Sequence, residues 1–258
     1  MAKLATRHWG ESGPRAVLVH GVTAWSNTWW RIGPAIAQRG WAVTAVDLRG
    51  HGHSPRAGTT VHLEELGADL LETTGTGVDL LVGHSLGALA SLSALNLDRS
   101  LAGCAVIEEP PGMTTVDRVL LAALMTAELE GVRADREEFA ANLARQNPRW
   151  HERDVQEAVE GMLLCDGEAI IRATATRDLS WDLAGLVAPL DLPLLALLAV
   201  DGRESFGTED GGSALVGGER ADFIEALGGN EHHVIDGGHC IHRSEPARWL
   251  EKVTNFVT

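Results

Sequence analysis

One serine lies in a sequence pattern that is typical of a nucleophile. Gly83-His84-Ser85-Leu86-Gly87 matches G-x-S-x-G, follows the apolar run 78–84 and precedes a segment with helical spacing over 86–97. Where this motif joins a strand to a helix, the sharp turn exposes the serine hydroxyl above the sheet, and the glycines permit close backbone approach. The helix N-terminus also favours developing negative charge. The alternative is a Gly-Ser-Gly turn that arises by chance.

A serine hydroxyl becomes a strong nucleophile only when a base accepts its proton, so a histidine partner is expected. His239 follows a short strand-like run and a Gly-Gly turn and precedes the last predicted helix, 245–256. A loop there can return to the ends of the strands, so we assign His239 as the base. His242 is expected to be a structural or rim residue. His232, His233, His239 and His242 lack carboxylate or cysteine partners in sequence, and we predict no metal site.

Acyl chemistry also needs amide donors for an oxyanion. The amide of Leu86 directly follows the nucleophile, and the loop after the first buried strand offers the amide of Val22. His20, in the same loop, is expected to form hydrogen bonds within the loop.

The elements that must position these residues alternate between strand and helix. Short, almost continuously apolar runs are typical of buried parallel strands, and they occur at 15–20, 41–47, 78–84, 103–109 and 193–200. Helical spacing occupies the intervals 26–39, 63–73 and 86–97. This alternation predicts an α/β fold with a mostly parallel sheet flanked by helices.

The alternation stops between the fourth and fifth apolar runs. The residues there contain amphipathic stretches and no convincing strand, and the segment is too long for a plain loop. We predict a core formed by residues 1–112 and 190–258, with an inserted helical cap over 113–189.

Composition excludes several function classes. The 258 residues carry a net charge of −15, which disfavours nucleic acid and anionic membrane surfaces as partners. Three widely spaced cysteines indicate neither a disulfide framework nor a thiolate zinc site. No run approaches the roughly 18 apolar residues of a membrane span, and the start has no signal core. We expect a cytoplasmic protein without cofactor.

Four segments, in this order and spacing, give the chain a resemblance to the α/β-hydrolase superfamily: HGVTAWSNTWW, DLRGHGHSP, GHSLGA and GGHCIHRSEP. The resemblance covers nearly the whole length. It implies a hydrolase fold with a cap, Ser85 as nucleophile, His239 as general base and then acid, and Leu86 and Val22 as oxyanion amides.

The carboxylate that orients the histidine is left open between two strands. In most relatives it follows the strand at 193–200, but neither Asp201 nor Asp210 has the usual spacing to the flanking motifs. A second group of relatives, which includes haloalkane dehalogenases and zearalenone lactonases, has the acid after the preceding strand. Glu109 stands twenty-four residues after Ser85, as in that group. Glu109 is our first choice, and Glu108 and Asp201 are the alternatives.

A serine at position 85 disfavours dehalogenase and epoxide hydrolase chemistry, because the dehalogenases and epoxide hydrolases of the superfamily that this chain resembles use a carboxylate as the nucleophile. Epoxide hydrolases also use cap tyrosines, and this chain has none. Cleavage of an ester or lactone remains the leading reaction. The alternatives are a binding protein or receptor with slow turnover, and a perhydrolase or cofactorless haloperoxidase.

The predicted pocket lies between sheet and cap. We expect its walls to include the residues Trp25, Trp29, Trp30, Met125, Trp150, Met162 and Trp181. Because no basic cluster lies near the motifs, we expect a small, neutral and fairly hydrophobic substrate.

Overall fold

A seven-stranded sheet forms the centre of the computed structural model, which describes residues 1–113, 118–176, 178–201 and 212–258. The strand order is β1-β3-β2-β4-β5-β6-β7, and only β1 runs antiparallel to its neighbour. The strands are β1 (Thr6–Trp9), β2 (Arg15–Val19), β3 (Ala42–Val46), β4 (Val78–His84), β5 (Ala102–Glu108), β6 (Leu194–Leu198) and β7 (Glu231–Val234). The predicted α/β fold class is confirmed.

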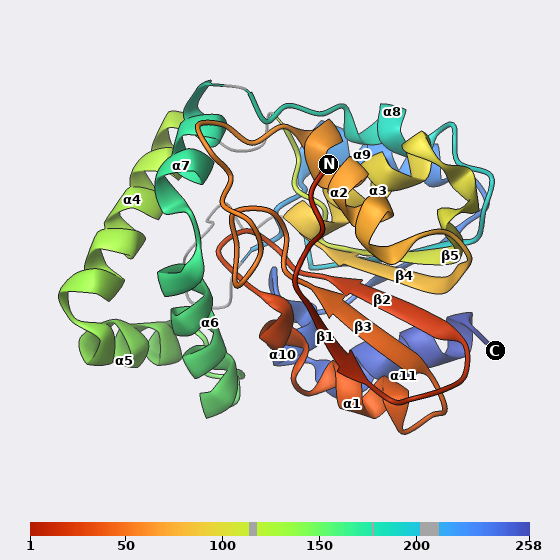
Figure 1. The fold of residues 1–258 in the computed structure, drawn as a ribbon, viewed down its shortest axis with the longest axis horizontal. Coiled ribbons are helices and arrows are strands. Elements are labelled where there is room, and N and C mark those ends of the chain that lie inside the picture. Colours follow the sequence, from red (N-terminus) through yellow and green to blue (C-terminus); the bar gives the residue numbers. More distant parts are fainter. Residues whose placement is uncertain (114–117, 177, 202–211) are drawn as a thin grey trace.

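Helices cover both faces of the sheet (Figure 1). One face packs against α2 (Leu63–Thr74), α3 (Leu86–Leu97), α8 (Leu183–Val187) and α9 (Gly217–Leu227). The other face packs against α1 (Ile32–Ala37) and α11 (Pro246–Phe256). The central strands are therefore buried on both sides, which explains why their sequences are continuously apolar.

Two sequence predictions differ from the structure in detail. The predicted helix 26–39 is divided into a 3₁₀ turn, η1 (Ser26–Trp29), and α1, with Gly33-Pro34 in the first turn of α1. Strand β1 was missed because it is a short edge strand whose residues are only half-buried or exposed. A second 3₁₀ turn, η2 (Arg99–Leu101), precedes β5, and the short helix α10 (Ile241–Ser244) precedes α11.

The segment between β5 and β6 contains helices that stand beside the sheet (Figure 1). These are α4 (Arg118–Ala134), α5 (Arg136–Gln146), α6 (Glu152–Leu164) and α7 (Gly167–Thr176). Helix α8 also falls inside the predicted cap range 113–189, but it packs against α3 and α9. The bounds of the cap, 113–189, therefore remain a prediction. Within the described residues, no helix is long and apolar enough to cross a membrane.

Hydrogen bonds fix α6 to the core on the side of η1. Asp154, near the start of α6, accepts from Trp30 Nε1 at 2.8 Å and forms an ion pair of 2.5 Å with Arg31. Trp25 Nε1 donates to the carbonyl of Glu157 at 3.2 Å. Trp25, expected in the pocket wall, therefore joins the helical segment to the core.

The crossing of β4, α3 and β2 leaves no space beside Gly87. A Cβ atom there would overlap the carbonyl oxygens of Val19 and His20. Gly103 on β5 is different, because the nearest atom to its Cβ would be the Asp79 carbonyl oxygen at 3.5 Å, an ordinary contact. The two glycines form a matched pair for testing how tightly this crossing is packed.

We expect Gly87→Ala to lower the free energy of unfolding by several kcal/mol, because overpacking against backbone costs about 1–3 kcal/mol or more. Gly103→Ala should change it by less than about 1 kcal/mol. Urea denaturation of the two variants tests this expectation. Equal stability in both would contradict the tight crossing.

Candidate active site

Ser85 occupies a strained turn between β4 and α3. Its backbone has φ 51° and ψ −119°, a left-handed conformation that L-residues with a side chain rarely adopt. The Ser85 amide donates to the carbonyl of Glu108 at 2.9 Å. Ser85 is 4% exposed and lines a pocket. The turn predicted from G-x-S-x-G is present, and it holds the hydroxyl at the pocket surface.

The loop after β2 lies directly against this turn. A Cβ atom on Gly21 would be 3.0 Å from Cβ of Ser85, so the backbone that carries Val22 passes beside the serine. His20 fixes the loop, since its Nδ1 is 2.7 Å from the Gly21 carbonyl and its Nε2 accepts from Leu48 N at 2.9 Å. Val22 and Leu86 both line the pocket. Leu86 begins α3, so its amide has no carbonyl partner within the helix.

His239 lies on the loop between β7 and α10 and lines the same pocket as Ser85. Its Nδ1 is 3.3 Å from Oε2 of Glu109. A proton on Nδ1 is the tautomer that this carboxylate favours, which leaves Nε2 as the acceptor nitrogen. His84 also holds this loop, because its Nε2 lies 2.9 Å from the His239 carbonyl and is placed to donate to it.

The carboxylate beside His239 belongs to Glu109, the residue that follows β5. Its backbone φ is 46°, a second left-handed position near the site, and its side chain is fully buried. Oε1 accepts from Ala199 N at 2.6 Å and Ser213 Oγ at 2.9 Å, and Oε2 accepts from Ala214 N at 2.9 Å. These bonds fix the carboxylate in one orientation toward His239.

The other candidate acids lie elsewhere. Asp201 follows β6 and is exposed, while Nδ1 of His239 is bonded to Glu109. Asp210 lies outside the described residues. Of the acids weighed from sequence and described by the structure, Glu109 is the one that contacts the histidine.

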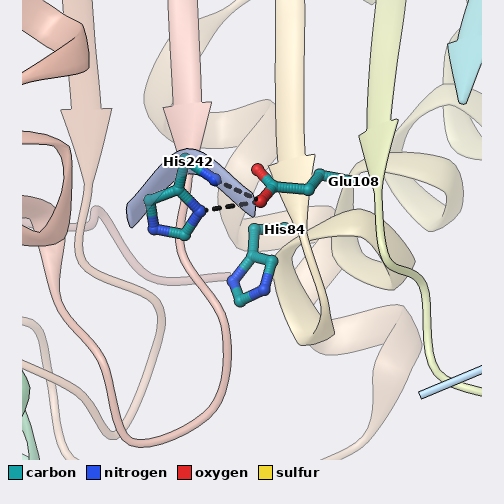
Figure 2. A group of neighbouring side chains, drawn as sticks. All are labelled: His84, Glu108 and His242. Atoms are coloured by element: carbon teal, nitrogen blue, oxygen red, sulfur yellow. Dashed lines mark hydrogen bonds and ion pairs between the residues drawn. The ribbon is translucent and has the colours of Figure 1, made fainter. Parts of the chain in front are cut away.

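Glu108 points to the opposite side of the strand, as expected for consecutive residues. Its Oε1 accepts from both the backbone N and Nδ1 of His242 at 2.9 Å, the two interactions drawn in Figure 2. Its Oε2 accepts from Trp249 Nε1 at 2.9 Å. Glu108 is fully buried, and this burial raises its pKa. Glu108 therefore attaches α10 and α11 to the sheet.

His84, Glu108 and His242 offer ligand atoms within 4.8 Å of one another, the geometry of a possible metal centre (Figure 2). Each of the three already has a protein partner. Glu108 accepts from His242 and Trp249, and His84 bonds to the His239 carbonyl. His242 Nε2 is 3.3 Å from Thr28 Oγ1. Both nitrogens of His242 and both oxygens of Glu108 are engaged in these bonds, so the cluster fits a structural network better than a metal centre.

The pocket has a volume of about 600 Å³ and lies between the sheet and the inserted helices. Of the residues expected in its wall, Met125, Trp150, Met162 and Trp181 line it. Trp25, Trp29 and Trp30 do not line it. Trp29 is fully buried on the other face of the sheet, with its ring 6.1 Å from that of Trp249. The expectation for Trp29 was wrong because an apolar pattern does not tell a core tryptophan from a pocket one.

Several residues of the site were missed by the sequence analysis. Ser213 binds the carboxylate of Glu109, and His84 binds the loop of His239. Arg118, Arg149 and Arg243 line the pocket. His84 lies inside the serine motif, so its proximity could have been noticed. No local pattern marks Ser213 or the arginines, because only the fold brings these distant segments together.

The fold is a layered α/β fold, and the pocket lies where the parallel strands end, which is the usual position of an active site in such enzymes. The chain belongs to the alpha/beta hydrolase family, whose sequence profile matches residues 16–252. It is thus an enzyme of the α/β-hydrolase superfamily, as the motifs in its sequence imply.

Individual relatives agree with this assignment. An esterase of Mycobacterium tuberculosis is 27% identical, over 98% of this chain and 86% of its own length. Among solved structures, an E-2-(acetamidomethylene)succinate hydrolase superposes with a TM-score of 0.78 at 23% identity, covering 98% of this chain and 94% of that one. An enol-lactonase from Burkholderia xenovorans LB400 gives 0.74 at 18% identity, with 98% and 96% covered. At these identities the two structures show a shared fold.

Four buried histidines favour a particular pH dependence of stability. Burial lowers the pKa of His20, lowers that of His51 to about 3, and holds the pKa values of His84 and His242 well below the usual range. Below about pH 6.5 the unfolded chain therefore binds protons that the folded chain does not. Burial raises the pKa values of Glu108 and Glu128, and this acts in the opposite direction, but these are two groups against four.

We therefore expect the free energy of unfolding to fall as the pH is lowered from 7.5 to 5.5, by up to about 1.4 kcal/mol per pH unit for each histidine that stays neutral. Urea titrations at the two pH values measure it. His51→Gln should make the dependence shallower. Equal stability at pH 5.5 and 7.5 would show that these histidines are not held neutral.

Proposed function

We propose that this protein is a serine hydrolase that cleaves a carboxylic ester or a lactone through an acyl-enzyme on Ser85. One observation carries the proposal. A serine on a strained turn shares a pocket with His239, and Nδ1 of that histidine is held by the buried carboxylate of Glu109. Nucleophile, base and orienting acid are the three parts that acyl transfer by a serine requires.

In the proposed reaction, Ser85 Oγ attacks the substrate carbonyl carbon while Nε2 of His239 takes the hydroxyl proton. The imidazolium that forms is stabilised by Glu109 across the bond at Nδ1. His239 then gives the proton to the leaving oxygen as the carbon–oxygen bond breaks. A water molecule repeats the attack on the acyl-enzyme, with His239 again as base, and releases the acid and free Ser85.

The oxyanion of the tetrahedral intermediate needs fixed donors. We assign this role to the amides of Leu86 and Val22, which belong to residues on the pocket wall on either side of Ser85. The N-terminus of α3 adds a partial positive charge at the same point. Removing one such donor in well-studied enzymes costs about 10²–10³ in kcat.

Esters and lactones are preferred among acyl substrates for two reasons. The proteins to which this chain is similar include an esterase and an enol-lactonase. The pocket wall has apolar residues, including Leu89, Met125 and Met162, that suit a carbon chain beside the reactive carbonyl.

We expect a fluorophosphonate probe to label the wild-type protein at Ser85, and Ser85→Ala to lose both labelling and hydrolysis of 4-nitrophenyl esters. Ser91→Ala on the same helix, where the hydroxyl donates to the Gly87 carbonyl, is the matched control and should retain both. Hydrolysis that persists in Ser85→Ala would overturn the assignment. A single burst of nitrophenol without steady turnover would instead indicate a binding protein of the same fold.

The acid is tested by three amide replacements. Glu109→Gln should lower kcat by about 10⁴-fold, because the charge that stabilises the imidazolium is lost while the shape is kept. Glu108→Gln should mainly lower the melting temperature, since Glu108 bonds to His242 and Trp249. Asp201→Asn should resemble wild type. If Asp201→Asn loses kcat while Glu109→Gln stays active, the orienting acid is Asp201, which follows β6, and not Glu109.

A further inference from the structure

The charge of the pocket differs from that of the whole chain. The sequence carries a net charge of −15, yet the described residues of the pocket wall include Arg118, Arg149 and Arg243 and a single carboxylate, Glu128. The expectation of a neutral substrate was based on the absence of a basic cluster near the motifs. The fold brings three arginines from separate segments to the wall of one pocket.

Two of the three arginines have evident structural contacts. Arg149 forms ion pairs with Glu245 at 3.4 Å and Asp236 at 3.6 Å. Arg118 donates to the Leu179 carbonyl at 2.8 Å and lies over the ring of Trp181. These contacts account for their positions at the pocket wall.

Arg243 is different, because it is a buried cation without a carboxylate partner. It is 6% exposed, and in the described part of the chain no carboxylate lies within ion-pair distance of it. The acids on neighbouring elements are engaged elsewhere, Asp154 with Arg31 and Glu245 with Arg149. A buried charge is normally paired, because removing it from water is costly.

The guanidinium of Arg243 is held in a fixed orientation. Its Nε and Nη2 donate to Thr28 Oγ1 at 3.1 and 2.7 Å, and its Cζ lies 4.5 Å from the ring centroid of Trp150. Thr28 Oγ1 is also 3.3 Å from Nε2 of His242, whose Nδ1 bonds to Glu108. Thr28 can therefore accept from Arg243 and donate to His242. The chain of bonds connects Arg243 to the buried strand end, so its orientation is set before any ligand binds.

We propose that Arg243 determines specificity by binding a carboxylate on the substrate, so that the ester or lactone carries an anionic group away from its reacting carbonyl. This inference is based on the proposed hydrolase function. Arg243 is four residues after His239 and lines the same pocket as Ser85. A planar guanidinium matches a carboxylate with two parallel hydrogen bonds. The bonds to Thr28 use Nε and Nη2 of Arg243, so the N–H groups of Nη1 remain for the carboxylate.

Matched acyl chains test the proposal. The mono-4-nitrophenyl esters of adipic, pimelic and suberic acids are compared with 4-nitrophenyl hexanoate, heptanoate and octanoate, which have the same chain lengths without the carboxylate. In the wild type, at least one anionic ester should have a kcat/KM about 10- to 100-fold above its neutral counterpart, the range of a charged hydrogen bond. Arg243→Gln should abolish this ratio, and Arg243→Lys should restore part of it.

Arg149→Gln is the matched control, because it removes another arginine of the pocket wall, one that is ion-paired with Asp236 and Glu245. It should leave the anionic-to-neutral ratio within about twofold of wild type. Melting temperatures of all variants separate loss of specificity from loss of fold. An anionic-to-neutral ratio near one in the wild type, or a ratio unchanged in Arg243→Gln, would overturn the proposal.

Binding without turnover keeps the test independent of the hydrolase assignment. In Ser85→Ala, calorimetry should detect monomethyl adipate, and the additional Arg243→Gln replacement should weaken its binding by about 10-fold or more. If no ester is hydrolysed but this difference in binding remains, the carboxylate site is supported and the hydrolase function fails. Binding that is indifferent to Arg243 contradicts the carboxylate site.

Discussion

Two carboxylates buried side by side at the end of β5 constrain the whole carboxyl-terminal part of the protein. Glu108 and Glu109 are both fully buried. A buried carboxylate is tolerated only where hydrogen-bond donors replace water. Because the strand sends the two side chains in opposite directions, each must collect its own donors, and the segments that supply them are thereby fixed against the sheet.

The two carboxylates bind different segments of the chain. Glu109 is bonded by Ala199, Ser213 and Ala214, which follow β6, and it orients His239. Glu108 binds His242 and, through Trp249, helix α11. The catalytic candidate His239 therefore lies on a loop that is attached at two points. Glu109 bonds to the ring of His239, and Glu108 bonds to His242, three residues further along the chain.

The sequence was most informative where one local pattern has one structural solution. Buried parallel strands produce continuous apolar runs, and G-x-S-x-G between a strand and a helix produces the turn at Ser85. The acid was harder to assign. Alternation shows that Glu108 and Glu109 point in opposite directions, but it does not show which direction leads to the pocket. That choice depends on β6 and α10, which are far away in sequence. Trp29 illustrates the same limit, because both faces of this sheet are covered by helices.

Neutral histidines around the site also favour its chemistry. His84 is next to Ser85 and bonds to the backbone of His239, and its low pKa keeps it uncharged. A cation there would oppose the imidazolium that the proposed acyl transfer would form on His239. The pKa of His242 is low as well, with desolvation as the largest cause and Arg243 adding to it. Arg149 near this loop is paired with Asp236 and Glu245, whereas Arg243 at the pocket wall has no carboxylate partner among the described residues. The neighbouring imidazoles serve as neutral hydrogen-bonding groups.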